Sequence, residues 1–376
     1  MADKTDYRFK LIYAIGMIMV IAGHMKCGID LTLGGWFPYL GLHLPLFAFA
    51  SGYFFRDSAV EKPGVYIFRK VKKLLVPLYV YNLVYGLIVY VSGFLGFHIG
   101  NLLNIYDLTL GPITDGHQFE YNMAGWYVIP LFMVEVYYVL MRKLFIKKIG
   151  AAYEWLVLAI SVALGVAGNQ IAYLGYNKGW WLVLVRMLYF VPFFALGTFY
   201  NRFLEKYERK VPGTILFPAL FGIKLILTMY YGKSLVYSPS WCEFKENGLM
   251  PLIVGVLGIF VWLRIATILE PILGRNKYVN LIADNTYSIM INQFIGFMIV
   301  KSVYAVIHRS TTLLPDFDME AYRTDIWYCY LPKGIAQMGI FYLIAGLAFP
   351  IGVQMLINRI KVGVAGATSR RANGAV

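Results

Sequence analysis

Long apolar runs separated by short polar stretches cover most of this chain. A helix that crosses a bilayer needs about 20 mostly apolar residues. The sequence offers such runs at roughly 9–27, 39–55, 74–97, 125–141, 153–173, 180–200, 213–231, 249–268, 281–305 and 333–357. Because helices satisfy all their backbone polar groups within lipid, the pattern predicts an all-α polytopic membrane bundle of about ten transmembrane helices.

Composition supports this fold class. The chain has 376 residues, of which 59% are hydrophobic and only 14% are charged, whereas soluble domains average about 25% charged residues. The mean hydropathy is +0.62. No internal repeat or long linker divides the sequence, so we expect one transmembrane domain over residues 1–376, ending in a basic cytoplasmic tail at 358–376.

Basic residues set the expected orientation, because Lys and Arg accumulate in cytoplasmic loops. With the N-terminus inside, 24 of the 34 Lys and Arg residues fall in inner segments, seven in outer segments and three within spans. Both termini are therefore predicted to be cytoplasmic. The net charge of +14 is then explained by inner loops that face anionic lipid, without a nucleic-acid partner.

Acidic and aromatic residues gather in the predicted outer loops, at 98–124, 232–248 and 306–332. Such side chains suit sugar rings and hydroxyls, although an interfacial aromatic belt with solvated acids explains any single one equally well. They are Asp107, Asp115, Glu120, Glu243, Glu246, Asp316, Asp318, Glu320 and Asp325, with Tyr106, Tyr121, Trp241, Tyr322, Trp327 and Tyr328.

Two histidines are expected at one depth in the membrane. At about 1.5 Å per residue, His24 lies roughly 24 Å above Arg8, near the outer end of the first helix. His43 lies just inside the second helix as the chain returns, with Ser51 one or two turns deeper. The pair suits proton transfer, but a histidine at a helix end also simply sits at the interface.

Other polar residues inside spans are functional candidates because they are costly there. They are Asn82, Glu135, Arg186, Lys224, Asn285, Asn292, Gln293 and Lys301. Glu135 and Arg186 are alternatively a structural ion pair. Lys224 and Lys301 lie nearer span ends, from which they can snorkel.

The cysteines and short sequence motifs give little further information about function. Cys27, Cys242 and Cys329 lie at or beyond the outer ends of spans, and the pair considered from the sequence is Cys242 with Cys329. The sequence contains no CxxC, HExxH, P-loop or GxSxG pattern. We therefore expect no metal.

Three stretches in order resemble the opening of a known family: "AIGMIMVIAGH", "LHLPLFAFASGYFFRD" and "YIFRKVKKLLVPLYVYN". They are similar to the acyltransferase-3 family of integral membrane O-acyltransferases, and most similar to its fucose 4-O-acetylase-like branch. "WYVIPLFMVEVYY", "YFVPFFALGTFYNR" and "NTYSIMINQF" resemble later helices more loosely. The chain departs from the family pattern at Tyr13, where many members have Arg or Lys, and at Asn292, where many have His before the position of Gln293.

The resemblance implies transfer of an acyl group, acetyl or succinyl, from cytosolic acyl-CoA to a hydroxyl of an extracytoplasmic glycan or glycolipid. His24 is the expected general base, and His43 the residue that orients it, positions the donor or takes part in a proton relay. Glu135 is the expected orienting carboxylate. The inner residues expected to bind the CoA phosphates are Arg69, Lys70, Lys72 and Lys73, although the positive-inside bias alone also explains them.

Further residues are expected to bind substrate. Ser51, Asn82 and Trp126 are candidate donors to the oxyanion, and a polar pore lined by Asn82, Glu135 and Asn292 would admit the donor. Arg186 and Asn292 complete the predicted substrate-binding set. We expect a multi-pass protein of the bacterial cytoplasmic membrane. Its expected partners are membrane lipids, the glycan or glycolipid acceptor and, as one option, further copies of the same chain.

Two other functions remain open from the sequence. A transporter or flippase for a polysaccharide or lipid-linked sugar also needs many helices and polar residues near the midplane. It gives no reason for the Gly-His and His-x-Pro-Leu-Phe pair, and the chain lacks the internal repeats common in transporters. A membrane sensor or scaffold has no soluble effector domain to support it.

Overall fold

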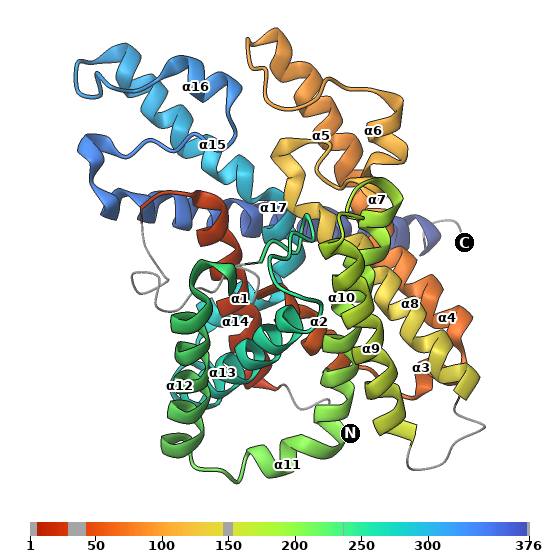
Figure 1. The fold of residues 1–376 in the computed structure, drawn as a ribbon. Helices are drawn as coiled ribbons and strands as arrows, with labels where there is room; N and C mark the ends of the chain where they lie inside the picture. The colour runs from red at the N-terminus through yellow and green to blue at the C-terminus, as the bar shows by residue number, and fades with distance from the viewer. Residues whose placement is uncertain (1–5, 29–42, 146–152, 236, 374–376) are drawn as a thin grey trace.

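The structure, a computed structural model, describes residues 6–28, 43–145, 153–235 and 237–373 (Figure 1). Within these ranges the chain forms helices and one isolated β-bridge, between Ser238 and Glu243, and no strand. The prediction of an all-α polytopic bundle is confirmed. The end of the bundle expected to face the cytoplasm is called the inner end below, and the opposite end the outer end.

Nine helical segments of the described chain are long and apolar enough to cross a membrane. Their main helices are α1 (Tyr7–Met25), α5 (Val76–Phe94), α8 (Val128–Phe145), α9 (Tyr153–Tyr173), α10 (Gly179–Phe199), α12 (Gly213–Tyr231), α13 (Met250–Leu273), α15 (Thr286–Ser310) and α17 (Gly339–Asn373).

Shorter helices join the spans. On the inner side lie α3 (Ser58–Glu61), α4 (Pro63–Lys70), α11 (Glu205–Glu208) and α14 (Lys277–Asp284), and on the outer side α6 (Ile105–Thr109), α7 (Gly111–Thr114) and α16 (Met319–Thr324). Two π-helical turns are η1 (Val71–Leu75) and η3 (Tyr200–Leu204). Four 3₁₀ turns are η2 (Glu120–Tyr127), η4 (Gly232–Leu235), η5 (Pro332–Gly334) and η6 (Ala336–Met338).

The second of the ten expected spans is the one that is not among these nine segments. The run predicted at 39–55 contains α2 (His43–Tyr53), a helix of 11 residues, which rises only about 16 Å against a hydrocarbon core of about 30 Å. Residues 39–42 lie outside the described residues. The described helix therefore reaches only part of the way through the bundle, and it begins at His43.

Close backbone packing fixes α2 against α10. A Cβ added to Gly197 would lie 2.0 Å from the backbone oxygen of Phe49, and one added to Gly52 would lie 1.9 Å from that of Phe194. Thr198 Oγ1 donates a hydrogen bond of 2.9 Å to the Gly52 carbonyl. Small residues let helix backbones approach within membranes, so these glycines hold α2 in place.

Several inner cations are committed to ion pairs. Arg8, whose side chain is fully buried, lies 2.7 Å from Glu205, and Lys10 pairs with Asp284 of α14. Arg142 forms hydrogen bonds of 2.8 and 2.9 Å with the two oxygens of Glu154. The first two pairs join inner segments that are far apart in sequence, and the third joins the consecutive helices α8 and α9.

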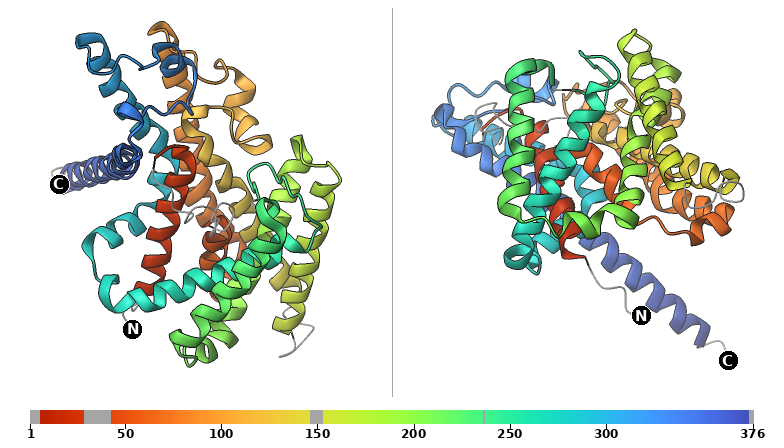
Figure 2. Two further views of the ribbon diagram at one scale, coloured as in Figure 1. Left: turned by 60° about the vertical axis from the view of Figure 1, so that its left-hand side comes forward. Right: turned by 60° about the horizontal axis from the view of Figure 1, so that its bottom comes forward.

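The helix α1 has neighbours on several sides. It packs against α2, α13, α14, α15 and α17. Figure 2 shows α1 among these helices and the C-terminal turns of α17 extending away from the bundle. The expected basic tail at 358–376 thus begins within α17, which runs on to Asn373. The outer end of α1 carries His24.

Candidate active site

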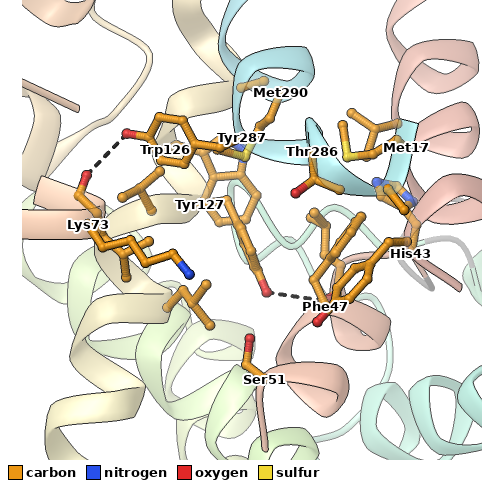
Figure 3. A pocket seen from close by; sticks show the side chains of 18 of the residues that line it. Met17, His43, Phe47, Ser51, Lys73, Trp126, Tyr127, Thr286, Tyr287 and Met290 are labelled. Carbon is orange, nitrogen blue, oxygen red and sulfur yellow. Dashed lines mark hydrogen bonds between the residues drawn. The ribbon is translucent and has the colours of Figure 1, made fainter. Parts of the chain in front are cut away.

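Two adjoining cavities run from the inner end into the bundle. The central cavity has a volume of about 430 Å³ (Figure 3). Its polar and aromatic lining residues are Tyr13, His24, His43, Phe47, Ser51, Lys70, Lys73, Trp126, Tyr127, Glu135, Asp284, Thr286 and Tyr287. The inner cavity, about 610 Å³, is lined by Tyr13, Ser51, Phe54, Phe55, Arg56, Ser58, Ala59, Glu61, Lys62, Tyr66, Arg69, Lys70 and Lys73.

The two cavities meet at four shared residues. Tyr13, Ser51, Lys70 and Lys73 line both of them. The inner cavity carries five basic residues against a single acid, Glu61. A positively charged opening therefore adjoins a smaller, more apolar space that leads to the histidines, which suits a ligand with an anionic head and a long narrow arm.

His24 and His43 both line the central cavity, in keeping with the similar depth predicted for them. His24 lies in the next-to-last position of α1, where its ring centroid is 5.2 Å from that of Phe294 and 6.1 Å from that of Trp327. His43 is the first residue of α2 and is buried. Figure 3 shows His43, Phe47 and Ser51 along α2, with Tyr127 facing them. The two histidines thus reach one space from two helices.

Gln293 fixes the tautomer of neutral His24. The Nε2 amide of Gln293 donates a 3.0 Å hydrogen bond to the carbonyl of Met290, which turns the amide oxygen Oε1 toward His24. Oε1 lies 3.1 Å from Nδ1 of His24. Because an amide oxygen only accepts, Nδ1 of neutral His24 carries the proton, and Nε2 keeps the lone pair that a base needs.

Within the described part of the chain, Glu135 forms its ion pair with Lys70 and not with Arg186. Its Oε1 accepts a 2.7 Å hydrogen bond from Nζ of Lys70, and its side chain is 3% exposed. Glu135 does line the central cavity. The expected pair with Arg186 is wrong, because Glu135 faces the inner half of the bundle, where the π-helical turn η1 begins directly after Lys70.

The four predicted CoA-binding cations separate into two groups. Lys70 and Lys73 line both cavities, and Arg69 lines the inner one, where Lys62 joins it. Lys72 lines neither cavity, and its Nζ lies 4.5 Å from the centroid of the Phe68 ring. Lys62, Arg69 and Lys73 have no ion-pair partner within the described part of the chain.

Asn82 and Asn292 lie outside the central cavity, contrary to the expected pore. Asn82 donates to the carbonyl of Asp107 at 2.9 Å and accepts a 2.5 Å hydrogen bond from Gln118, so it holds the outer loop. Asn292 donates to the carbonyl of Ser288 at 3.0 Å and accepts from the Tyr85 hydroxyl at 2.8 Å. Both amides are engaged within the fold.

Trp126 and Arg186 lie on the outer side of the central cavity. Trp126 lines the cavity, and the guanidinium of Arg186 lies 4.8 Å from the Trp126 ring centroid. Arg186 is 1% exposed and does not line the central cavity. It donates to the backbone carbonyls of Asp115 and Ser240. The predicted substrate-binding arginine therefore holds two outer loops together above Trp126.

A disulfide closes the outer end near His24. Cys27, three residues after His24, bonds to Cys329, while Cys242 is a free and buried thiol. The pair considered from the sequence, Cys242 with Cys329, is therefore wrong, because the outer loop that carries Trp327 folds back over α1. Lys26 Nζ lies 3.9 Å from the centroid of the Trp327 ring and reinforces this contact.

Sequence reasoning missed three lining or positioning residues. Gln293 was only one of eight polar residues within spans, and Tyr13 was noted only as a departure from the family pattern. Tyr127, whose hydroxyl donates to the carbonyl of Leu44 at 3.4 Å, gave no signal beyond the aromatic content of its segment. Among the described residues, no group of three His, Cys, Asp or Glu side chains is placed to hold a metal ion.

Comparison with known proteins gives a match to one family. The family model described as "Acyltransferase domain" (Acyl_transf_3) matches residues 6–358. Neither the comparison with curated proteins nor that with solved structures found a match. The match spans all nine candidate membrane-crossing segments almost completely, so the chain belongs to the acyltransferase-3 family and is a multi-pass membrane acyltransferase.

Proposed function

We propose that this protein transfers an acyl group, acetyl or succinyl, from cytosolic acyl-CoA to a hydroxyl of an extracytoplasmic glycan or glycolipid. One observation carries the proposal: a basic inner cavity adjoins a central cavity that reaches His24 and His43. The protein would act in the bacterial cytoplasmic membrane with both termini in the cytoplasm, in keeping with its basic inner segments.

The donor binds from the inner end. Lys62, Arg69 and Lys73 hold the phosphates of CoA, since cations that lack ion-pair partners attract polyanions most strongly. The pantetheine arm, roughly 15 to 20 Å long by chain reach, passes the residues shared by the two cavities and carries the thioester into the central cavity. On this proposal the two adjoining cavities are the route by which a cytosolic thioester reaches a histidine near the outer end of α1.

His24 acts as the general base. The acceptor hydroxyl, whose pKa lies far above 7, gives its proton to Nε2 of His24 as its oxygen attacks the thioester carbonyl. The tetrahedral intermediate then collapses: the C–S bond breaks, an ester C–O bond remains, and the proton passes to the leaving thiolate of CoA. Gln293 accepts the hydrogen bond from Nδ1–H of His24 both before and after the ring takes up this proton.

Other lining residues have supporting roles. Ser51 and Trp126 each carry a hydrogen-bond donor and line the central cavity, so they are the candidate donors to the oxyanion. Asn82 is not proposed as a donor to the oxyanion, because its amide donates hydrogen bonds to backbone carbonyls of the outer loop. His43 positions the thioester from the end of α2. The Lys70–Glu135 pair leaves the wall of the donor path electrically neutral at that point.

The test is acyl transfer by the purified full-length protein. Radiolabelled acetyl-CoA or succinyl-CoA is incubated with the protein and a set of bacterial surface glycans, and the label on the glycan is measured. We expect label from at least one donor and release of free CoA in equal amount. If no acyl-CoA donates label, yet the protein moves a labelled glycan across a proteoliposome membrane, the chain works as a flippase and the proposal fails.

A further inference from the structure

A third cavity, called the outer cleft below, opens at the outer end of the bundle. It measures about 400 Å³ and lies between the α6–α7 segment, the N-terminal end of α10 and the 237–243 segment. Its main polar and aromatic lining residues are Tyr106, Asp115, Asn177, Lys178, Trp241 and Glu243. None of these residues lines the central or the inner cavity.

Hydrogen bonds to backbone carbonyls give the outer cleft a fixed shape. Arg186 donates to the carbonyl of Asp115 through Nη1 and to that of Ser240 through Nε, both at 2.7 Å. The Asn177 amide donates to the carbonyl of Trp241 at 3.1 Å. A buried arginine that bridges two loops is a strong constraint, so the walls of the cleft are built before any ligand arrives.

A stack of rings links the outer cleft to the active site. The His117 ring lies 4.2 Å from that of Trp241, at an interplanar angle of 16°. The same His117 ring lies 6.2 Å from the ring of Trp126, at 26°. Trp126 lines the central cavity. The outer cleft is therefore a neighbour of the central cavity, with the His117 ring close to both Trp241 of the cleft and Trp126 of the cavity.

The chemistry of the outer cleft suits an uncharged sugar. One face of Trp241 stacks on His117, while 43% of the residue stays exposed, and aromatic faces accept the apolar face of a pyranose. Carboxylates accept hydrogen bonds from ring hydroxyls, and amides both accept and donate them. Asp115 and Glu243 outnumber Lys178, so a polyanionic glycan is disfavoured.

The protonation states of Asp115 and His117 preserve the excess of negative charge in the outer cleft at neutral pH. Burial alone would raise the pKa of Asp115, but the hydrogen bond from His117 and the charge of Arg186 lower it below its ordinary value. Burial lowers the pKa of His117, against the opposing effect of Asp115. Asp115 is therefore a carboxylate and His117 a neutral ring, so the acidic side of the cleft persists.

We propose that the outer cleft binds a neutral sugar unit of the acceptor glycan, next to the unit whose hydroxyl is acylated, with its ring stacked on Trp241. The inference rests on the proposed function, because it assigns the class of acceptor. The hydroxyls of this unit bind Asp115 and Glu243, and the neighbouring unit reaches past Trp126 into the central cavity.

The test is direct binding without an acyl donor. Full-length protein in detergent is titrated with neutral trisaccharides, namely maltotriose, mannotriose, xylotriose and chitotriose, and with trigalacturonate as the anionic counterpart. The readout is saturation-transfer NMR together with thermophoresis. We expect at least one neutral trisaccharide to bind, and Trp241→Ala to weaken its binding about tenfold, which is the loss of one stacking contact. Trp241→Phe should retain most of the affinity.

A matched control is Trp180→Ala. Trp180 is 64% exposed near the same end of α10 and does not line the outer cleft, so its loss should leave binding unchanged. Unchanged affinity in Trp241→Ala, tighter binding of trigalacturonate than of every neutral trisaccharide, or no binding of any neutral trisaccharide would each overturn the inference. Because no donor is present, these outcomes are independent of whether acyl transfer occurs.

Discussion

Gln293 Oε1 lies 3.1 Å from Nδ1 of His24, and the two residues are 269 positions apart in the sequence. Gln293 is fully buried, and its amide is turned by the Met290 carbonyl. An uncharged amide thus does here what an aspartate does for the histidine of a serine protease: it fixes which ring nitrogen carries the proton. The tautomer of His24 on α1 therefore depends on a side chain of α15.

The first prediction concerns Gln293→Leu. This change removes the acceptor for Nδ1–H, so neutral His24 is free to adopt the wrong tautomer. We expect kcat to fall about 10- to 100-fold, or about 1.4 to 2.7 kcal/mol in activation free energy, with KM for both substrates unchanged. Steady-state acyl transfer measures both constants.

Rescue by a conservative change separates positioning from folding. Gln293→Glu keeps an acceptor oxygen and, once ionised, favours the protonated form of His24. Its kcat should therefore exceed that of Gln293→Leu, and the acid limb of its pH–rate profile should move to higher pH. Equal losses in both variants, with no movement of the profile, would mean that Gln293 only packs the helix.

The second prediction separates Lys73 from Lys72. Lys73 lines both cavities, whereas Lys72 lines neither and lies over Phe68. Lys73→Gln should raise the KM for acyl-CoA about 5- to 10-fold without changing kcat, and the effect should shrink at high salt because salt screens the attraction. Lys72→Gln is the matched control and should match wild type. A larger effect at Lys72 than at Lys73 would place the CoA phosphates elsewhere.

Hydropathy predicted most of the fold for a definite physical reason. Backbone polar groups must be satisfied within lipid, so each long apolar run has to be a helix, and nine runs are. The tenth expected run, 39–55, is described only from His43 onward, where α2 has 11 residues, so nine of the ten expected spans are found among the described residues. The shared depth of His24 and His43 followed from helix rise alone, and both line one cavity.

Hydropathy and helix rise could not predict which side chains His24 and Glu135 contact. The first helix is apolar on all sides, so its sequence does not show which way His24 faces. Whether Glu135 meets Arg186 or Lys70 depends on how α8 is rotated about its axis, which is set by packing between helices and not by periodicity. The roles of His24 as base and His43 as donor-positioning residue remain predictions.

The third prediction concerns the disulfide between Cys27 and Cys329. Its removal in Cys27→Ser/Cys329→Ser should lower the free energy of unfolding by about 2 to 4 kcal/mol. It should also lower kcat, because the loop that packs Trp327 against His24 is no longer tied to α1. Thermal melting and transfer assays with and without reductant measure both effects.

Cys242→Ala serves as the control for the disulfide. Its thiol is free and buried, so this variant should keep the sensitivity of wild type to reductant. Peptide mapping that finds Cys242 joined to Cys329 would contradict the assignment.

The fourth prediction concerns the contact between α2 and α10. Gly197→Ala places a methyl group 2.0 Å from the Phe49 carbonyl oxygen, so the helices must separate. We expect a loss of stability of about 1 to 3 kcal/mol or more and reduced transfer, since His43 and Ser51 move with α2. Gly222→Ala is the matched control in another span, because its added methyl meets nothing within 4 Å. Equal melting temperatures for the two variants would count against the packing described here.

The most direct test of the account is acyl transfer across a bilayer. Oriented proteoliposomes receive radiolabelled acyl-CoA on the inner face of the protein and a glycan acceptor on the outer face. Wild type is compared with His24→Ala and with a control, His98→Ala. His98 is an exposed outer histidine that lines none of the three cavities. The account predicts labelled glycan with wild type and His98→Ala, at least a hundredfold less with His24→Ala, and none when the donor is supplied only outside. Full transfer by His24→Ala, or equal transfer with the donor on the outer face, would contradict it.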